Sequence, residues 1–278
     1  MNQFHEIKHY ILKEHKTFFK RYYWLTKAFI RNVFLRYSQI PYLEVFETTK
    51  CNLSCEKCSN LIPQLKKQVH YPANGIISNI ESILRYAKYI YRLKLHGGEV
   101  FLHQDLSKLI DYVSRNKRII SARITTNGTI IPNESILQAL SNSRVVVQIS
   151  EYEISSGNIP KLIQLFKDRH IKYVLLKDRE WRDMGDFSER ESNRFFECSI
   201  KRCTSLFGEN VYVCSRAAMA LNEHEISDSY HININGLSSK EFRTSLQQLY
   251  TIPNKACSHC DGDTKYAKPI QAGKQVQR

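Results

Sequence analysis

The chain has 278 residues, of which 42% are apolar and 24% charged, so a packed core is attainable without covalent staples. No uninterrupted apolar stretch is longer than a few residues, which excludes a membrane-spanning helix. The formal net charge of +14 favours anionic partners, without choosing among phosphorylated or nucleotide-linked substrates, nucleic acid and anionic lipid.

Residues 10–37 carry a helical pattern rich in aromatic side chains. The basic residues fall opposite the apolar stripes, at Lys13, Lys16, Lys20, Lys27 and Arg31. Such a helix can make a peripheral contact with an anionic membrane surface. We favour the alternative that its apolar face packs on the adjoining domain, because so wide an apolar arc needs a cover.

After Pro41, short β-branched runs alternate with helical segments. Strands are predicted at 42–46, 92–96, 121–125, 145–150 and 172–176, and helices at 76–89, 105–115, 133–140 and 159–168. This alternation predicts an α/β fold with a parallel sheet that curls into a full or partial barrel. Sites in such folds lie at the carboxyl ends of the strands.

Cys51, Cys55 and Cys58 follow the first predicted strand, so one short loop can deliver three thiolates to a single centre. Three thiolates on a four-iron cluster leave one iron open to bind and reduce a small molecule. A structural zinc loop is the less favoured alternative, because it needs a fourth Cys or His nearby and His70 lies twelve residues on.

Polar groups also end the next three predicted strands. After the second come Gly97, Gly98 and Glu99, where the glycines allow close backbone approach and the carboxylate can accept hydrogen bonds from an ammonium group. The third ends at Asn127, and the fourth at Gln148-Ile149-Ser150. Asn-Gly is also a common turn pair, so Asn127 has an equally good structural interpretation.

A second cysteine group lies near the C-terminus. Cys203 and Cys214 bracket a predicted hairpin with its turn at 208–210, and Cys257 and Cys260 enclose a two-residue gap. Together they could form a closed four-thiolate site for zinc or for an iron-sulfur cluster. Cys198 is left over, as a spare thiol or as a replacement for Cys203.

The cysteine spacing, followed one βα unit later by Gly-Gly-Glu, resembles the radical S-adenosylmethionine (radical SAM) family over roughly residues 42–262. The resemblance implies a partial parallel (β/α)6 TIM-like barrel with a 4Fe-4S cluster on the first three cysteines. It implies S-adenosylmethionine binding by Gly97, Gly98, Glu99, Asn127, Gln148 and Ser150. One position departs from the family pattern, since the residue before the third cysteine is Lys57 rather than an aromatic.

The second cysteine group resembles the shortened auxiliary-cluster domain, of the twitch or SPASM type, found after the barrel in some of these enzymes. That resemblance implies a second 4Fe-4S cluster on Cys203, Cys214, Cys257 and Cys260. We therefore divide the chain into an N-terminal helical extension (1–40), a radical SAM barrel (41–190), an auxiliary domain (191–262) and a flexible tail (263–278).

The implied activity is reductive cleavage of S-adenosylmethionine to a 5′-deoxyadenosyl radical that abstracts hydrogen from a substrate. We favour a dehydrogenase-like oxidation of a sugar, cyclitol or nucleotide-linked small molecule, because an auxiliary cluster can accept the second electron and the basic charge suits an anionic substrate. The electrons would come from a reductant protein such as flavodoxin or ferredoxin. A peptide-modifying maturase is one alternative, although no peptide-recognition domain is evident at the N-terminus.

A non-catalytic iron-sulfur or zinc protein is the other alternative. A module that binds nucleic acid has no need of the Gly-Gly-Glu segment, so we do not expect such a partner. With no signal-peptide pattern at the N-terminus, the thiols are expected in a reducing cytoplasm.

Two further sets of side chains are candidates for contact with a substrate. The segment after the fifth strand offers Trp181, Arg182 and Asp183, which could equally belong to a surface loop. A general base for alcohol oxidation could be supplied by His96, His103 or Glu151, and the sequence does not choose among them.

Overall fold

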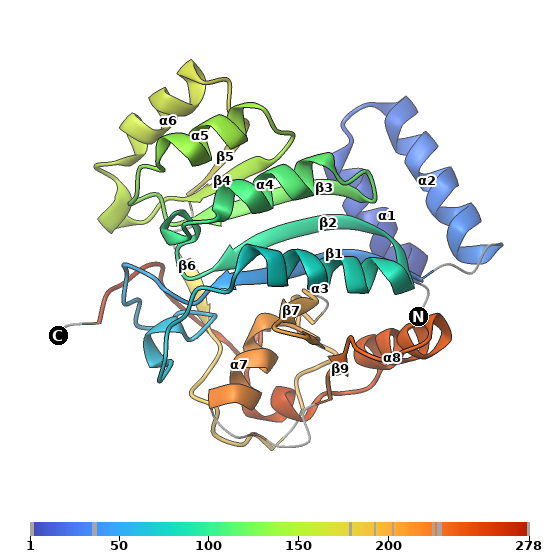
Figure 1. The fold of residues 1–278 in the computed structure, drawn as a ribbon. Coiled ribbons are helices and arrows are strands. Elements are labelled where there is room, and N and C mark those ends of the chain that lie inside the picture. Colours follow the sequence, from blue (N-terminus) through green and yellow to red (C-terminus); the bar gives the residue numbers. More distant parts are fainter. Residues whose placement is uncertain are drawn as a thin grey trace.

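The structure is a computed structural model that describes residues 3–34, 38–177, 180–191, 193–201, 203–223, 226 and 230–276. Its centre is an eight-stranded sheet in the order β5-β4-β3-β2-β1-β7-β8-β9 (Figure 1). Neighbouring strands are parallel from β5 to β7, and β8 and β9 are antiparallel additions. The predicted α/β fold with a mostly parallel sheet is therefore confirmed.

The bounds of the elements follow the predicted alternation closely. The strands are β1 Ser38–Thr48, β2 Ala87–Gly97, β3 Ile119–Thr126, β4 Val146–Ser150, β5 Tyr173–Leu176, β6 Glu180–Asp183, β7 Ser205–Phe207, β8 Asn210–Tyr212, β9 Ile232–Asn233 and β10 Lys268–Gln271. The α-helices are α1 Gln3–Glu14, α2 Phe18–Val33, α3 Ala73–Tyr86, α4 Leu106–Arg115, α5 Glu134–Ser141, α6 Ile159–Asp168, α7 Ser215–Glu223 and α8 Ser239–Thr251. Short 3-10 turns lie at η1 Ile62–Gln64, η2 Val100–Leu102, η3 Glu153–Ser155 and η4 Lys255–His259.

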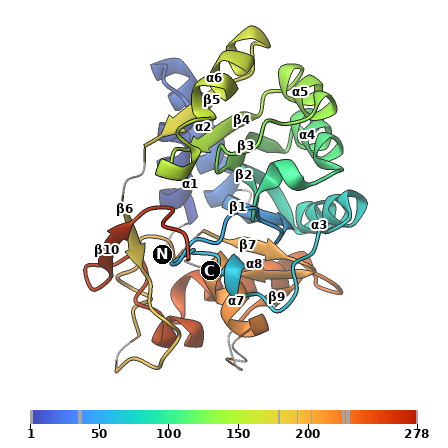
Figure 2. The same cartoon turned by 90° about the vertical axis from the view of Figure 1, so that its left-hand side faces the viewer.

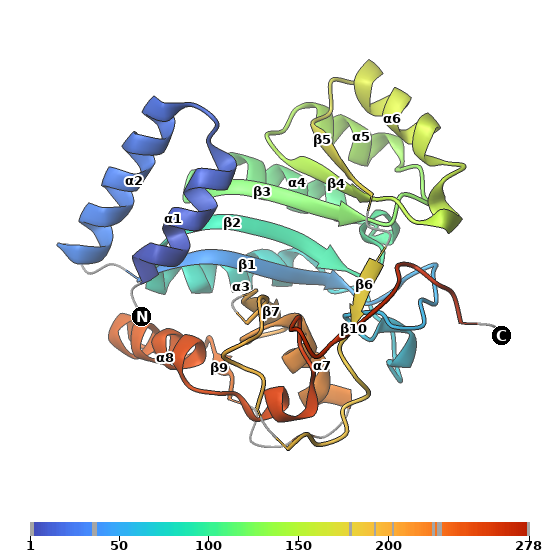
Figure 3. The same ribbon diagram turned by 180° about the vertical axis from the view of Figure 1, so that it is seen from behind.

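The two faces of the parallel strands have different chemistry. Leu43, Leu93 and Ile124 are fully buried and share one core with apolar residues of α3 to α6, such as Ile80 and Leu162. Figures 1 and 3 show α3 and α4 on this face of β1–β3 and α1 across the other face. Because side chains alternate along a strand, the opposite face presents a second set of residues toward the interior of the partial barrel.

The N-terminal extension forms two helices rather than the one continuous helix expected over 10–37. The break comes at Thr17, whose extended backbone (φ −88°, ψ 142°) precedes the first turn of α2. Ile7 and Ile11 of α1 are buried with Ala28 of α2 and Tyr91 of β2, so the extension does pack on the domain. Residues 35–37, the end of the predicted helix, lie outside the described residues.

None of the described helices is both long enough and apolar enough to cross a lipid bilayer.

The predicted hairpin is present as β7 and β8, with Gly208 in the left-handed region at φ +57°. β7 also pairs with β1 in parallel, through Glu44 with Ser205 and Val45 with Leu206. The hairpin is therefore joined to the barrel sheet by main-chain hydrogen bonds.

The expectation of a flexible tail over 263–278 is wrong for its described part, which ends at residue 276. β10 pairs antiparallel with β6, and Figure 2 shows the chain then running toward the cysteine loop. The polar, aperiodic composition misled the prediction, because main-chain pairing to another segment needs no apolar period. Residues 268–276 are called the C-terminal strap below.

Candidate active site

The cysteine loop begins directly after β1, at the carboxyl edge of the sheet. Cys51 and Cys58 are partly exposed and Cys55 is buried, with 9% of its surface accessible. The loop is held locally by the hydrogen bond from Leu61 N to Cys58 O, 2.9 Å long. All three thiols therefore come from one tightly folded segment at the predicted edge.

Each thiol of this loop has an N–H group aimed at its sulfur. Leu53 N lies 3.4 Å from Cys51 Sγ, and Gln275 Nε2 lies 3.2 Å from Cys55 Sγ. Burial raises the pKa of Cys58, and the backbone N–H groups that follow it act in the opposite direction. Burial also raises the pKa of Cys51, to about 12, which favours the neutral thiol.

Gly97 and Gly98 are required by the close approach of the cysteine loop to the end of β2. Gly98 N donates to Thr48 O at 2.9 Å, and Glu99 N donates to Lys50 O at 2.8 Å. A Cβ atom on Gly97 would lie 2.0 Å from Thr48 O, and one on Gly98 would lie 2.1 Å from Lys50 O. The two glycines thus fix the loop against the sheet whether or not they also contact a cofactor.

Glu99 is fully buried, and its carboxylate is occupied by protein donors. It accepts hydrogen bonds from Thr126 Oγ1 at 2.7 Å, Asn127 N at 2.8 Å and Phe101 N at 3.1 Å. A carboxylate has about four acceptor positions, so these three donors leave room for another, and the expected contact with an ammonium group stays a prediction. Glu99 also joins the end of β2 to the end of β3, and the main chain around Gly97 and Gly98 faces the loop.

Asn127 lies beside the cysteine loop. Its Nδ2 is 3.0 Å from Asn52 Oδ1 and 3.9 Å from Cys51 Sγ, while its Oδ1 accepts from Thr129 N at 2.9 Å. Asn127 therefore forms a turn and lies beside the loop, and its contact with a cofactor stays a prediction. Gln148 is half-buried and Ser150 is buried, at the end of β4, and β3 and β2 separate β4 from the strand that the cysteine loop follows.

The inner face of the sheet forms two polar layers below this edge. In one layer, Lys94 of β2 lies beside Glu44 of β1 on one side and Arg123 of β3 on the other. Lys94 Nζ is 3.3 Å from Glu44 Oε1. In the layer nearer the edge lies His96, whose Nε2 is 2.7 Å from Asn60 Nδ2. Burial, reinforced by Lys94, lowers the pKa of His96 to about 4, so its imidazole is neutral and accepts the Asn60 amide proton.

His103 and Glu151, the other two candidates for a general base, lie in different environments. His103 is buried, with Nε2 2.8 Å from Tyr71 O and Nδ1 accepting from Asp105 N, so backbone groups occupy both ring nitrogens. Glu151 lines a cavity at the ends of β4 and β5, where its Oε2 is 3.6 Å from Lys177 Nζ.

The segment of Trp181, Arg182 and Asp183 forms β6 and makes contacts within the protein. The Trp181 ring packs edge-on against Tyr152, and Arg182 Nη1 donates to Ala267 O at 3.3 Å. Asp183 pairs with Lys57 across 3.0 Å. Lys57, in place of the usual aromatic residue, therefore connects the cysteine loop to β6.

The C-terminal strap lies along the cysteine loop and was missed by the sequence analysis. Gln275 Oε1 accepts from Ser54 N at 2.8 Å while its Nε2 donates to Cys55 Sγ. Glu56 N donates to Lys274 O at 2.8 Å, and the two side chains form an ion pair of the same length. No local pattern in the sequence could have indicated this pairing, since its two partners are more than 200 residues apart.

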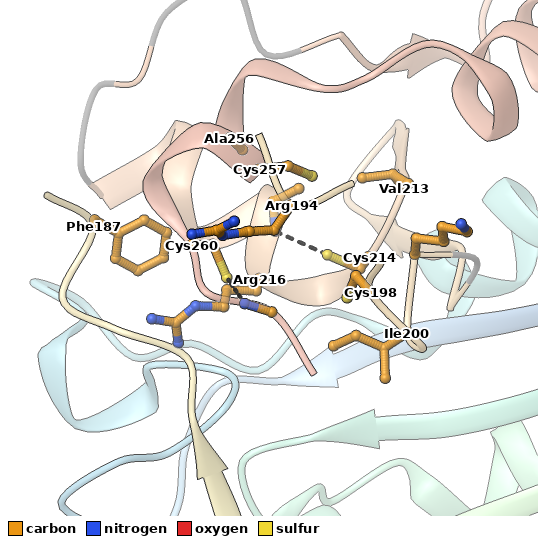
Figure 4. Close-up of a pocket in the computed structure, with 13 residues that line it drawn as sticks. Phe187, Arg194, Cys198, Ile200, Val213, Cys214, Arg216, Ala256, Cys257 and Cys260 are labelled. Carbon is orange, nitrogen blue, oxygen red and sulfur yellow. Dashed lines mark hydrogen bonds between the residues drawn. The ribbon is translucent and has the colours of Figure 1, made fainter. Parts of the chain in front are cut away.

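The second cysteine group gathers around a cavity near α7 and η4 (Figure 4). Cys198, Cys214, Cys257 and Cys260 all line it. Cys214 Sγ accepts a hydrogen bond from Ala217 N at 3.4 Å, and Cys260 Sγ accepts one from Gly262 N at 3.2 Å. Four thiols from three separate segments thus face one space.

Cys203 does not line this cavity. It precedes β7, and burial raises its pKa well above the usual value, with Glu44 of the barrel interior as the next contribution. Cys198 thus lines the cavity with the other three thiols, whereas Cys203 lies outside its wall but close enough to Cys214 and Cys198 to interact with them electrostatically. In the sequence, Cys203 and Cys214 flank the predicted hairpin, which favoured Cys203 as a ligand. Spacing alone does not show toward which side of a strand a thiol points.

The walls of this cavity fit an anionic metal cluster. Arg216 is buried, with 4% of its surface accessible, and its Nε has no hydrogen-bond partner among the described residues. Arg194 also lines the cavity, and its Nε is likewise buried without such a partner in the part of the chain that the structure describes. Two guanidinium groups at the wall of a cavity lined by four thiols would stabilise the negative charge of a cluster with four thiolate ligands.

No group of three or more His, Cys, Asp or Glu side chains, within the described ranges, is arranged to hold a single metal ion. A four-iron cluster sets a different requirement, because each thiolate binds a separate iron and the sulfurs stay further apart.

No family model matches the chain. It is 34% identical over 95 residues to GTP 3′,8-cyclase of Clostridium acetobutylicum, covering 34% of this chain and 29% of the relative. It is 28% identical over 127 residues to GTP 3′,8-cyclase of Aquifex aeolicus, covering 44% of this chain and 38% of the relative. These matches therefore span well under half the length of the curated relatives.

Two solved structures share the fold. BtrN in complex with AdoMet and 2-DOIA aligns with a TM-score of 0.50 and 17% identity, over 86% of this chain and 98% of that one. Native anSMEcpe with bound AdoMet aligns with a TM-score of 0.50 and 15% identity, over 78% of this chain and 82% of that one. The chain therefore resembles these cyclases over about a third to under half of its length, and it shares its fold with the two proteins solved with AdoMet.

The glycine contact gives the first prediction. Gly98→Ala should lower the free energy of unfolding by about 2 kcal/mol or more, because the new Cβ would overlap Lys50 O and force the cysteine loop away. Gly75→Ala is the matched control, since a Cβ there meets nothing and alanine favours the helix α3 by up to about 1 kcal/mol. Chemical denaturation measures both, and equal stabilities for the two variants would contradict the close contact.

Proposed function

We propose that the chain binds a 4Fe-4S cluster through Cys51, Cys55 and Cys58 and uses it to cleave S-adenosylmethionine reductively. When bound, the reduced cluster supplies an electron to the sulfonium, which generates methionine and a 5′-deoxyadenosyl radical that abstracts hydrogen from a substrate. The observation that carries the proposal is the position of the three thiols at the carboxyl edge, pinned to the Gly97-Gly98 main chain.

The chain's own groups have distinct tasks in this proposal. The main chain at Gly97 and Gly98 and the side chain of Asn127 lie beside the loop, and they would orient the methionyl end. Glu99 acts as a positioning residue that holds Asn127 through its backbone N–H. Gln148 and Ser150, further along the edge, would meet the nucleoside end. The strap excludes water from one side of the loop.

The substrate class we propose is a sugar, cyclitol or nucleotide-linked small molecule with anionic character. The Lys94 and Arg123 side chains on the inner face, and Lys177 at the edge cavity, suit phosphate recognition. The relatives named GTP 3′,8-cyclase have a nucleotide in their name, which supports the nucleotide-linked part of this class.

For the second centre we propose Cys198, Cys214, Cys257 and Cys260 as ligands of an auxiliary 4Fe-4S cluster. This set replaces the one implied by the resemblance, in which Cys203 took the place of Cys198. Arg216 would stabilise negative charge at both centres, because it lines this cavity and also lies close enough to Cys58 to lower its pKa. An auxiliary acceptor of this kind favours a two-electron oxidation of the substrate.

Anaerobic reduction with S-adenosylmethionine should yield 5′-deoxyadenosine from the wild-type chain, measured by liquid chromatography. A Cys58→Ala variant should yield none, because the open iron requires all three thiolates. With a nucleotide sugar as substrate, we expect equal amounts of 5′-deoxyadenosine and oxidised product. Substrate returned as an epimer carrying solvent hydrogen would contradict the oxidation while preserving the radical step.

The two ligand sets for the second centre predict different metal contents. After anaerobic reconstitution, the wild-type chain should hold about eight irons, and Cys198→Ala and Cys214→Ala should each fall to about four. Cys203→Ala should keep about eight. Iron and sulfide analysis with EPR spectroscopy measures this, and the reverse pattern for Cys198 and Cys203 would restore the set implied by the family.

Gln275 should raise the reduction potential of the first cluster, because its N–H dipole points at Cys55 Sγ and stabilises the additional electron. We expect Gln275→Leu to lower the midpoint potential by about 40 mV, the equivalent of one hydrogen bond of about 1 kcal/mol. An EPR-monitored redox titration without turnover measures the shift. Gln271→Leu, at an exposed position of the same strap whose amide reaches Glu153 instead, should leave the potential unchanged.

A further inference from the structure

The outward side of α2 carries a cluster of exposed apolar side chains, with the exposed Thr26 among them. Phe18, Phe19 and Tyr22 have 76%, 85% and 67% of their surfaces exposed, and Phe34 just past the helix has 72%. The same side continues with Tyr23, Phe29, Ile30 and Val33, all at least 42% exposed. These eight residues are called the aromatic face of α2. Scattered single apolar residues are normal on a protein surface, but a contiguous patch of this kind marks an interaction site.

The other side of α2 is already used to hold the helix on the domain. Ala28 and Asn32 are buried, and Trp24 and Leu25 pack against the cluster formed by Ile7, Ile11 and Tyr91. The Arg31 guanidinium lies 3.7 Å above the ring centre of Tyr89. The helix is therefore fixed in orientation, and the aromatic face is the side that remains for a partner.

The charge along this segment is entirely positive. Residues 15–34 contain Lys16, Lys20, Arg21, Lys27 and Arg31, with no Asp or Glu. Helical periodicity puts Lys20 and Lys27 together along one flank of the aromatic face, while the guanidinium of Arg31 lies against Tyr89. Lys27 Nζ lies 4.2 Å from the centre of the Tyr23 ring, so its stem runs along the face while its charge stays at the border.

We propose that the aromatic face of α2 docks on the surface of an anionic lipid bilayer. Aromatic and aliphatic side chains would enter the boundary between headgroups and acyl chains, and the basic flank would pair with lipid phosphates. A second copy of the chain is a poorer occupant, because it would bring the same cations together without a single acidic residue from this segment.

The docked orientation leaves the candidate active site accessible. Figures 1 and 3 show α2 at the end of the sheet opposite the cysteine loop and the strap. A bilayer against the aromatic face would therefore lie far from the carboxyl edge. The docking does not depend on the proposed radical chemistry, and the two can fail separately.

Vesicle co-sedimentation of the full, anaerobically purified chain tests the proposal. We expect binding to vesicles of equal parts phosphatidylglycerol and phosphatidylcholine at about 0.15 M salt, and none to pure phosphatidylcholine. Raising the salt to about 1 M should weaken the binding strongly. The triple variant Phe18→Ser, Phe19→Ser, Tyr22→Ser should lose it, and Lys20→Glu should weaken the partition coefficient about tenfold or more.

Matched variants elsewhere separate the docking face from general surface effects. Ile252→Ser removes an apolar side chain that is 55% exposed after α8, and Lys240→Glu reverses an exposed charge at the start of α8. Both should bind vesicles as the wild type does. The proposal is overturned if the wild type ignores anionic vesicles, or if the triple variant binds equally well. It is also overturned if the wild type is a dimer in solution that the triple variant makes monomeric, since a second copy would then cover the face.

Discussion

The organisation of this protein depends on one main-chain contact, in which the ends of β1 and β2 approach so closely that only glycine fits at 97 and 98. The hydrogen bonds from Gly98 N to Thr48 O and from Glu99 N to Lys50 O continue the β1–β2 ladder beyond the strands. They determine where the cysteine loop leaves the sheet. The buried Glu99 carboxylate then extends the same constraint to β3 by accepting hydrogen bonds from Thr126 and Asn127. The Glu99 carboxylate, which the sequence indicates as a cofactor-binding group, thus also holds the ends of β2 and β3 together.

Segments distant in the sequence complete this edge. The C-terminal strap supplies Gln275 to the loop, and β6 supplies Asp183 to Lys57. Arg216, at the start of α7, lies between the two cysteine groups. The first loop is therefore bordered by the barrel on one side and by the C-terminal third of the chain on the other, which explains how a site that must exclude water can form on a partial barrel.

The N-terminal helices serve a different purpose from the barrel helices. α3 to α6 bury their apolar sides against the sheet, whereas α2 buries the side around Ala28 and leaves the aromatic one outward. The sequence offers two uses for the apolar side of the N-terminal helix, packing on the domain or contact with a membrane, and packing is the one it favours. The apolar side of α2 is too wide to be covered by one contact, and α1 covers only the part around Ala28.

The sequence by itself determined the local elements and the chemistry of the first site. Alternating β-branched runs and helical periods gave every strand and helix from β1 to β5, because these patterns act within a few residues. The cysteine spacing and the Gly-Gly pair likewise act over short range. Only the tertiary structure decided that Cys198 lines the second cavity and Cys203 does not, that residues 268–276 form the C-terminal strap, and that the Glu99 carboxylate is buried. Each of these depends on contacts between residues far apart in the chain, and such contacts leave no periodic trace in the sequence.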